Sequence, residues 1–235
     1  MGKVRAVCIS EKRGTQKKNI ESAVFVENWG IEGDAHAGNW HRQISLLSEE
    51  TIAAFKARGA EVTDGAFGEN LVVSGYDFTK FPIGTRFTCK DVVLELTQIG
   101  KECHHGCEIF QKMGECIMPT NGVFAKVLHG GKISVGDEFH VQYRAAVITL
   151  SDTASKGERE DASGAAVEEI VGKEGYEVVF KKIIPDDGDT LTALLCELSD
   201  EDKADLILTT GGTGFSKRDN TPEATMRAVE RETPG

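Results

Sequence analysis

Residues 205–225 read DLILTTGGTGFSKRDNTPEAT, and this stretch decides the fold that we expect for the second part of the chain. Its apolar start is typical of a buried strand, its middle is a glycine-rich turn, and Pro222 suits the first turn of a helix over Thr221–Arg231. Glycines after a parallel strand let backbone amides approach an anion, and the positive end of the following helix attracts it further. The turn lacks both the Gly-Lys-Ser/Thr of a P-loop and the G-x-G-x-x-G of a dinucleotide site. A glycine-rich turn without a ligand is the alternative.

The residues before this stretch alternate between strand and helix patterns. Strands are expected over Arg144–Leu150 and Glu177–Ile184, and helices over Ala162–Lys173 and Thr190–Leu198. Such alternation predicts a parallel sheet with helices on its faces. Ligands of these sheets bind at the carboxyl ends of strands, where the strand order reverses. If the order is second, first, third, the ends of the first and third strands border this crevice.

Polar residues follow each of the three strands. Asp186 and Asp219 are our candidates for holding Mg²⁺, which favours one or two carboxylates together with substrate phosphates. We expect the amides of the Gly-Gly-Thr-Gly turn to hold a phosphate. A helix cap is the alternative role for Asp186 and for Asp152. The candidate ligand-binding residues of this part are Ser151, Asp152, Gly211, Gly212, Thr213, Gly214 and Thr221.

Several segments of this part together resemble the MoaB/Mog family of molybdopterin-binding proteins. They are Thr149–Asp152, Ile184–Asp186, Thr209–Gly214 and Arg218–Thr225. The resemblance implies a three-layer α/β domain, often trimeric, that adenylylates molybdopterin with Mg-ATP. In that reaction the terminal phosphate of the pterin attacks the α-phosphate of ATP and pyrophosphate leaves, so positioning and charge neutralisation matter more than a covalent nucleophile. By this resemblance Asp186 and Asp219 are catalytic, and the glycine turn holds the pterin phosphate.

The same resemblance bears on the end of the chain. The domain of that family continues beyond the segment matched here by Glu232–Gly235. The resemblance therefore implies that the second domain, residues 144–235, is truncated at its C-terminus and lacks part of the pocket wall.

The first part of the chain, residues 1–143, carries many short strand signals separated by turn residues. The strands expected here are Lys3–Ser10, Ser22–Glu27, Gln43–Leu47, Asn70–Val73, Val92–Gln98 and Glu138–Gln142. This pattern indicates a mainly β barrel or sandwich. One helix is expected over Ser48–Arg58, where Ser48 can cap the start and Gly59 ends the helix. The predicted architecture is a mainly β domain followed by a three-layer α/β domain with a parallel sheet.

A cluster of thiols and imidazoles follows the strand Val92–Gln98. Cys103, His104, His105 and Cys107 lie within five residues. A nearby positive charge stabilises a thiolate, which is the reactive form of cysteine, so a functional thiol is one interpretation. A structural zinc site at Cys103–Cys107 is a second, although such sites usually need two close pairs of ligands. A strand-to-helix turn with unreactive thiols is the third.

Two further motifs in the first part sharpen this choice. Gly33-Asp34-Ala35-His36-Ala37-Gly38 and Gly68-Glu69-Asn70-Leu71 resemble the MOSC domain, which is named for the C-terminal part of molybdenum-cofactor sulfurases. The resemblance implies a mainly β domain that carries sulfur on a cysteine or binds the molybdenum cofactor. By this resemblance Cys103 is the functional cysteine, and His36 and Arg42 lie near the site. A hydrogen-bonded turn or core residue is the alternative for His36.

Composition excludes some classes of function. The chain has 235 residues, of which 40% are hydrophobic and 28% charged, and its formal net charge is −11. A nonspecific nucleic-acid binder usually carries the opposite charge. No apolar run approaches the roughly 20 residues of a membrane span, and the N-terminus does not look like a signal peptide, so we expect a cytoplasmic protein with reduced cysteines.

Both parts point to molybdenum cofactor biosynthesis. We expect molybdopterin or the molybdenum cofactor as ligand, with Mg²⁺ and ATP if adenylyl transfer takes place, and cofactor or sulfur handling at Cys103. A cysteine desulfurase or a molybdoenzyme is the expected protein partner, and a homo-oligomer is an open alternative. The other interpretations are a non-catalytic carrier of the cofactor and a zinc-stabilised structural module.

Overall fold

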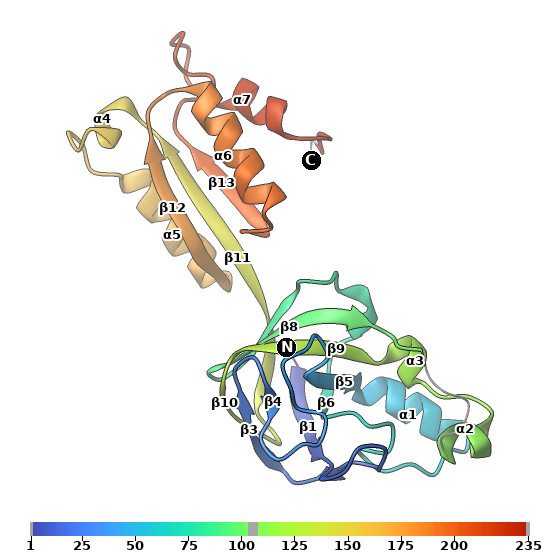
Figure 1. Cartoon of the computed structure of the whole chain (residues 1–235). Helices are drawn as coiled ribbons and strands as arrows, with labels where there is room; N and C mark the ends of the chain where they lie inside the picture. The colour runs from blue at the N-terminus through green and yellow to red at the C-terminus, as the bar shows by residue number, and fades with distance from the viewer. Residues whose placement is uncertain (1, 103–107, 234–235) are drawn as a thin grey trace. The chain divides into compact units, whose positions relative to one another are not determined.

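The structure is a computed structural model that describes residues 2–102 and 108–233. The chain divides into two compact units, Met1–Val141 (unit 1) and Gln142–Gly235 (unit 2), and Figure 1 shows the elements of each. Strand β11 (Glu138–Leu150) begins in unit 1 and ends in unit 2. The sequence predicted two separate strands here, which was wrong: no glycine or proline interrupts the chain, and Tyr143 pairs with Tyr176 of the next strand.

Unit 1 is mainly β, as the turn-rich sequence predicts. Its strands follow the hydrogen-bonded order β11-β7-β8-β9-β5-β6-β1, and Gly2 of β1 pairs in turn with Phe139 of β11. The pairing of β5 with β6 is parallel, so the sheet is mixed. A smaller sheet has the order β10-β3-β4. The strands are β1 (Gly2–Ile9), β2 (Lys18–Asn19), β3 (Ser22–Val26), β4 (Gly30–Ile31), β5 (Ile44–Ser48), β6 (Leu71–Ser74), β7 (Arg86–Cys89), β8 (Val92–Ile99), β9 (Val123–His129) and β10 (Gly131–Ser134).

The helices of unit 1 are short. They are α1 (Glu49–Ala57), the 3-10 helix η1 (Phe78–Lys80), α2 (Glu108–Met113) and α3 (Met118–Asn121). Helix α1 confirms the predicted helix, because the Ser48 hydroxyl accepts a hydrogen bond from the backbone N–H of Thr51 at its start.

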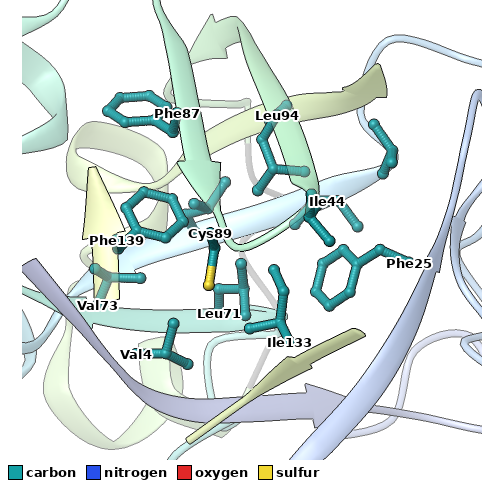
Figure 2. Close-up of a cluster of buried hydrophobic side chains, with 14 of the residues drawn as sticks. Val4, Phe25, Ile44, Leu71, Val73, Phe87, Cys89, Leu94, Ile133 and Phe139 are labelled. Carbon is teal, nitrogen blue, oxygen red and sulfur yellow. The ribbon is translucent and has the colours of Figure 1, made fainter. Parts of the chain in front are cut away.

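The main sheet of unit 1 is apolar on both faces. Alternate residues of each strand point to opposite sides, so Leu46 and Leu47 belong to different clusters of buried side chains. Figure 2 shows the larger cluster, in which the rings of Phe87 and Phe139 stack with centroids 5.4 Å apart. The second cluster contains Phe55 of α1. Burial on both faces makes this sheet a rigid frame for the loops at its edges.

Unit 2 is a parallel sheet of three strands between helices. Strand β11 lies between β12 (Tyr176–Ile184) and β13 (Leu206–Thr210), which confirms the order second, first, third. Helix α5 (Ala162–Lys173) lies on one face, and helices α6 (Gly188–Asp200) and α7 (Thr221–Ala228) lie on the other (Figure 1). The short helix α4 (Asp152–Ser155) follows β11. Helices on both faces explain why the strands read as continuous apolar runs.

The buried face of α5 does not coincide with its apolar side chains. Ala166, Val167, Ile170 and Val171 share one face by helical spacing, but Ile170 is 60% exposed. The buried residues are Gly164 and Val171, seven positions apart on the helix. Because Gly164 has no side chain, the helix packs closely beside Thr149 of β11, and apolar side chains alone could not reveal that face.

Within residues 2–102 and 108–233, no helix combines the length and the apolar character that crossing a bilayer requires.

Candidate functional site

The glycine-rich turn of unit 2 connects β13 to α7 and is held by Thr221. The backbone N–H of Thr221 donates to the Gly212 carbonyl at 3.0 Å, and its hydroxyl donates to the Gly211 carbonyl at 2.9 Å. Gly211 and Gly212 have φ angles of +87° and +61°, in the left-handed region that favours glycine. A Cβ on Gly211 would overlap the carbonyl oxygen of Leu150. The turn therefore requires glycine, while Thr213 and Gly214 lie exposed at its tip.

Residues at the ends of β11 and β12 bind each other directly. The backbone N–H of Asp152 donates to Asp186 Oδ2 at 3.1 Å, and the backbone N–H of Asp186 donates to Asp152 Oδ1 at 3.2 Å. Arg218, from the segment after β13, contacts Asp152 through both terminal nitrogens, with Nη1 2.9 Å from Oδ2 and Nη2 3.0 Å from Oδ1. A two-point guanidinium–carboxylate contact fixes geometry as well as charge. All three strand ends are thus joined at one place, as the parallel sheet predicts.

The two predicted Mg²⁺ ligands lie beside the glycine turn. A Cβ built on Gly214 would lie 2.8 Å from Asp219 Oδ2, and one built on Gly212 would lie 3.5 Å from Asp186 Oδ1. Within the described part of the chain, no group of three or more His, Cys, Asp or Glu side chains could hold a metal ion. Two carboxylates fit Mg²⁺ only together with phosphate oxygens from a ligand. The residues therefore fit a metal that arrives with its substrate.

Helix caps account for some of the alternatives. Asp187, not Asp186, caps α6, because its carboxylate accepts from the backbone N–H of Thr190 at 3.2 Å. The cap interpretation of Asp186 is therefore wrong. Ser151 caps α4 by accepting from the backbone N–H of Ala154 at 3.1 Å. Asp152 occupies the first turn of that helix.

Unit 1 contains a cavity of about 860 Å³ whose lining is basic. Its basic lining residues are Lys17, His36, Arg42 and Lys101, and none of the described residues that line it is acidic. This contrasts with the net charge of −11 for the whole chain. Trp40, Phe67 and Phe124 supply aromatic surface to the same cavity. Basic groups with aromatic walls suit a planar anionic ligand.

Arg42 lies between two rings at the cavity. Its guanidinium carbon is 5.0 Å from the centroid of Trp40 and 5.6 Å from that of Phe124, within the range of cation–π interaction. Its Nε atom is buried and has no hydrogen-bond partner among the described residues. The rings hold the side chain in place while part of its hydrogen-bonding capacity is unused.

A buried ion pair links Lys17, which lines the cavity, to Asp34. Lys17 Nζ is 2.5 Å from Asp34 Oδ2, and the two side chains are only 2% and 0% exposed. Asp34 also accepts from the backbone N–H of Ser10 at 3.1 Å and from Asn70 Nδ2 at 2.9 Å. Burial opposes the ionisation of Asp34, but these hydrogen bonds outweigh it and lower the pKa of the carboxyl. Burial lowers the pKa of Lys17, against the attraction of Asp34.

His36 stands between this ion pair and the cavity. Its side chain is 34% exposed, and its Nδ1 atom is 3.5 Å from Lys17 Nζ and 3.7 Å from Asp34 Oδ1. Burial and the positive charge of Lys17 lower the pKa of His36, although Asp34 opposes this, so the imidazole is neutral at pH 7. A role as a hydrogen-bonded turn or core residue does not account for all of the surroundings of His36, because its side chain also lines the cavity.

Glu69 organises another wall of the cavity. It is fully buried, and its two carboxyl oxygens accept from the backbone N–H groups of Gly65 at 2.7 Å and Phe67 at 3.0 Å. Burial raises the pKa of Glu69 to about 7, although these hydrogen bonds oppose the rise. The next residue, Asn70, accepts through Oδ1 from the backbone N–H and the hydroxyl of Ser45, at 3.1 and 3.0 Å. The buried Glu69 and Asn70 side chains of the Gly-Glu-Asn-Leu motif thus hold the backbone of the residues that line this side of the cavity.

We expect the stability of unit 1 to fall as pH rises from about 5 to about 7, by up to about 1.4 kcal/mol per pH unit through Glu69. The folded state keeps a proton on Glu69 in this range, whereas the unfolded chain, with an ordinary pKa, releases it. Urea unfolding followed by tryptophan fluorescence measures this slope. Glu69→Gln removes the ionisation but leaves His36 and Asp34 in place. Equal slopes for the two proteins would contradict the assignment.

The predicted functional cysteine, Cys103, lies outside the described residues, and so does the alternative zinc site at Cys103–Cys107. Three other cysteines of unit 1 are described, and two of them, Cys8 and Cys89, are buried. Burial raises the pKa of Cys8 and of Cys89 to about 12, which keeps them as unreactive thiols. Lys101, two residues before Cys103 in the sequence, lines the cavity.

The sequence also failed to indicate two residues of the candidate sites. Lys17 of the unit 1 cavity lies in the loop between β1 and β2, where no periodicity or motif marks it. Arg218 of unit 2 entered only as part of the segment Arg218–Thr225, because its contact with Asp152 depends on the strand order. Both contacts form only once the chain is folded.

Comparisons with known proteins agree with the two units. Residues 33–140 match the family model of the MOSC domain, and residues 146–235 match that of a probable molybdopterin binding domain. The chain is 40% identical over 91 residues to the molybdopterin adenylyltransferase of Helicobacter pylori and 42% identical over 90 residues to that of Pyrococcus furiosus. Each alignment covers 38% of this chain and 52% of the relative, so the chain spans about half the length of these curated relatives.

One solved structure resembles a larger share of the chain. The YUAD protein from Bacillus subtilis superposes with a TM-score of 0.52, covering 60% of this chain and 96% of that protein. The two sequences are 22% identical, so the likeness concerns the fold alone.

Proposed function

Because this chain joins a MOSC domain, residues 33–140, to a probable molybdopterin binding domain, residues 146–235, we propose that it binds molybdopterin and acts in molybdenum cofactor biosynthesis. One observation carries the proposal for unit 2. The turn Gly211–Gly214 has Asp186 and Asp219 beside it and Arg218 across the neighbouring strand ends. Amides, carboxylates and a guanidinium in one place suit a ligand with phosphate groups and a divalent cation.

Adenylyl transfer is the reaction that this arrangement favours. A phosphate oxygen of molybdopterin attacks the α-phosphate of ATP, a new P–O bond forms, and the bond to the β-phosphate breaks to release pyrophosphate. The amides of Gly211–Gly214 orient the attacking phosphate, and Arg218 offsets negative charge at the strand ends. Mg²⁺ held by Asp186 and Asp219 would neutralise charge on the ATP phosphates. The chain spans only part of its relatives, so turnover is tested separately from binding.

We expect Asp219→Asn to reduce pyrophosphate release by about 10²-fold or more, while molybdopterin binding stays within about threefold, because the carboxylate acts on the reacting phosphates. The purified chain of 235 residues, mixed with molybdopterin and Mg-ATP, provides both readouts. Asp200→Asn, at the exposed end of α6, is the matched control. Undiminished release from Asp219→Asn would refute the catalytic role.

A carrier role is the second candidate for unit 2. In that case the protein binds molybdopterin tightly, releases no pyrophosphate, and shields the pterin in the glycine turn. The observation that favours it is the contact of Arg218 with Asp152, which neutralises one acidic group without a metal. Binding without turnover in the unaltered protein would select this role.

For unit 1 we propose that the basic cavity receives the cofactor and that Cys103 carries sulfur to it. After incubation with a cysteine desulfurase and cysteine, we expect a persulfide on Cys103, seen by mass spectrometry as one added sulfur atom. Cys103→Ser should abolish this addition, whereas Cys196→Ser in α6 should leave it unchanged. An added sulfur that persists in Cys103→Ser would refute the role. Zinc that co-purifies and is lost in Cys103→Ser would favour the structural alternative instead.

A further inference from the structure

We propose that His36 meets the ligand of the unit 1 cavity as a neutral hydrogen-bond donor through Nε2–H, and that Lys17 fixes this tautomer. The ligand group that it serves is an oxyanion, of which phosphate is the simplest case. The choice of ligand rests on the function proposed for unit 1, whereas the tautomer is a property of the free protein. His36 contacts the ligand in this scheme, and Lys17 is a positioning residue.

The ammonium group of Lys17 has three N–H donors and no acceptor. One donor is directed to Asp34 Oδ2 at 2.5 Å, and His36 Nδ1 lies 3.5 Å from the same Nζ atom. A group that can only donate requires a lone pair on Nδ1. The proton of the neutral ring must then be on Nε2.

Asp34 competes with Lys17 as the hydrogen-bond partner of His36 Nδ1. If Asp34 accepted from His36, the proton would be on Nδ1. Both carboxylate oxygens of Asp34 are already engaged, however. Oδ2 accepts from Lys17 and Asn70, and Oδ1 accepts from the backbone N–H of Ser10 and lies 3.5 Å from its hydroxyl. Oδ1 is also 3.7 Å from His36 Nδ1, which is too long for a hydrogen bond.

Three charged groups face His36. They are Lys17, Asp34 and Arg13, whose Nε donates to the carbonyl of Ala35 at 3.0 Å. Two cations and one carboxylate disfavour a positive charge on the imidazole. Since Nδ1 faces the buried pair and the ring lines the cavity, Nε2–H is the edge left for a ligand. A neutral donor beside Arg42 and Lys101 suits an oxyanion, because it adds a hydrogen bond without a further charge that must be desolvated.

The test is a long-range ¹H–¹⁵N correlation on the full chain with ¹⁵N-labelled histidine, assigned with the variant His36→Gln. We expect His36 to have the Nε2–H tautomer at pH 7 and to titrate below its ordinary range. Lys17→Met should shift the proton to Nδ1, where Asp34 is then free to accept, and raise the pKa. Asp34→Asn should leave the proton on Nε2, because Lys17 still donates to Nδ1. The spectrum of the unaltered protein decides the matter even if a variant fails to fold: an Nδ1–H tautomer there overturns the proposal.

Inorganic phosphate tests the donor role. We expect its addition to shift the Nε2 resonance of His36 while Nδ1 stays unprotonated, and to leave exposed His140 unchanged as the matched control. His36→Phe should weaken phosphate binding by about tenfold, the value of one hydrogen bond, and His36→Gln by less, because Gln retains a donor. Protonation of Nδ1 on binding overturns the neutral-donor role. If His36 has the Nε2–H tautomer but its resonances do not respond to phosphate, the oxyanion ligand assigned to unit 1 is wrong. The molybdopterin site of unit 2 is tested separately, by pyrophosphate release.

Discussion

Asp34→Ala is expected to destabilise unit 1 by about 3–5 kcal/mol, because it leaves the buried ammonium of Lys17 without its carboxylate. The Lys17 side chain is only 2% exposed, so water cannot replace the lost partner without rearrangement. The same change removes an acceptor from Ser10 and from Asn70. Few single substitutions have effects of this size.

Tryptophan fluorescence isolates this effect. The chain has two tryptophans, Trp29 and Trp40, and both belong to unit 1. Urea unfolding at pH 7 therefore reports the free energy of unfolding of that unit. The double variant Lys17→Met with Asp34→Leu should recover more than half of the loss, because it removes both buried charges together. A loss below about 1 kcal/mol for Asp34→Ala would mean that the pair is hydrated rather than buried.

Gly211→Ala is expected to destabilise unit 2 by more than about 3 kcal/mol and to abolish binding at the glycine turn. Alanine at a φ of +87° costs about 1–2 kcal/mol, and its Cβ would also overlap the carbonyl oxygen of Leu150. That oxygen belongs to the backbone at the end of β11, so it cannot move aside as a flexible side chain would. Separation of β13 from β11 would then displace the turn.

Hydrogen exchange of peptides from β13 and α7 measures this loss, with tryptophan fluorescence as the check that unit 1 is unchanged. The matched control is Gly172→Ala in α5, where a Cβ would meet no atom within 4 Å. Alanine in a helix is favoured over glycine, so this control should be neutral or stabilised by up to about 1 kcal/mol. Equal protection of β13 in Gly211→Ala and Gly172→Ala would show that the turn tolerates a side chain.

Local signals predicted the elements of the fold well. Helix α5 covers the predicted range Ala162–Lys173, and Ser48 caps α1 as expected, because both depend on residues close in sequence. The same holds for the parallel order of β11, β12 and β13, which follows from alternating strands and helices. Strand β9 was missed, since Val123–His129 lies among turn signals and its partners β5 and β8 are distant in sequence.

The candidate sites were predicted only in part. The sequence identified Asp34 within a motif but not Lys17, because an ion pair between two loops leaves no trace in either loop alone. It identified Asp186, with a helix cap as the alternative role, but the residue that caps α6 is the neighbouring Asp187. Long-range contacts of this kind depend on packing, which periodicity and spacing do not encode.

The basic lining of the unit 1 cavity has a consequence for how a ligand arrives. At physiological ionic strength, charges act over about 8 Å. Beyond that distance an anion senses neither the net charge of −11 nor the basic lining, and it is drawn in only once it reaches the mouth of the cavity. Such a pocket forgoes long-range electrostatic steering, so its selectivity has to come from close fit, and a labile anionic cargo is better handed over by a docked donor than captured from dilute solution.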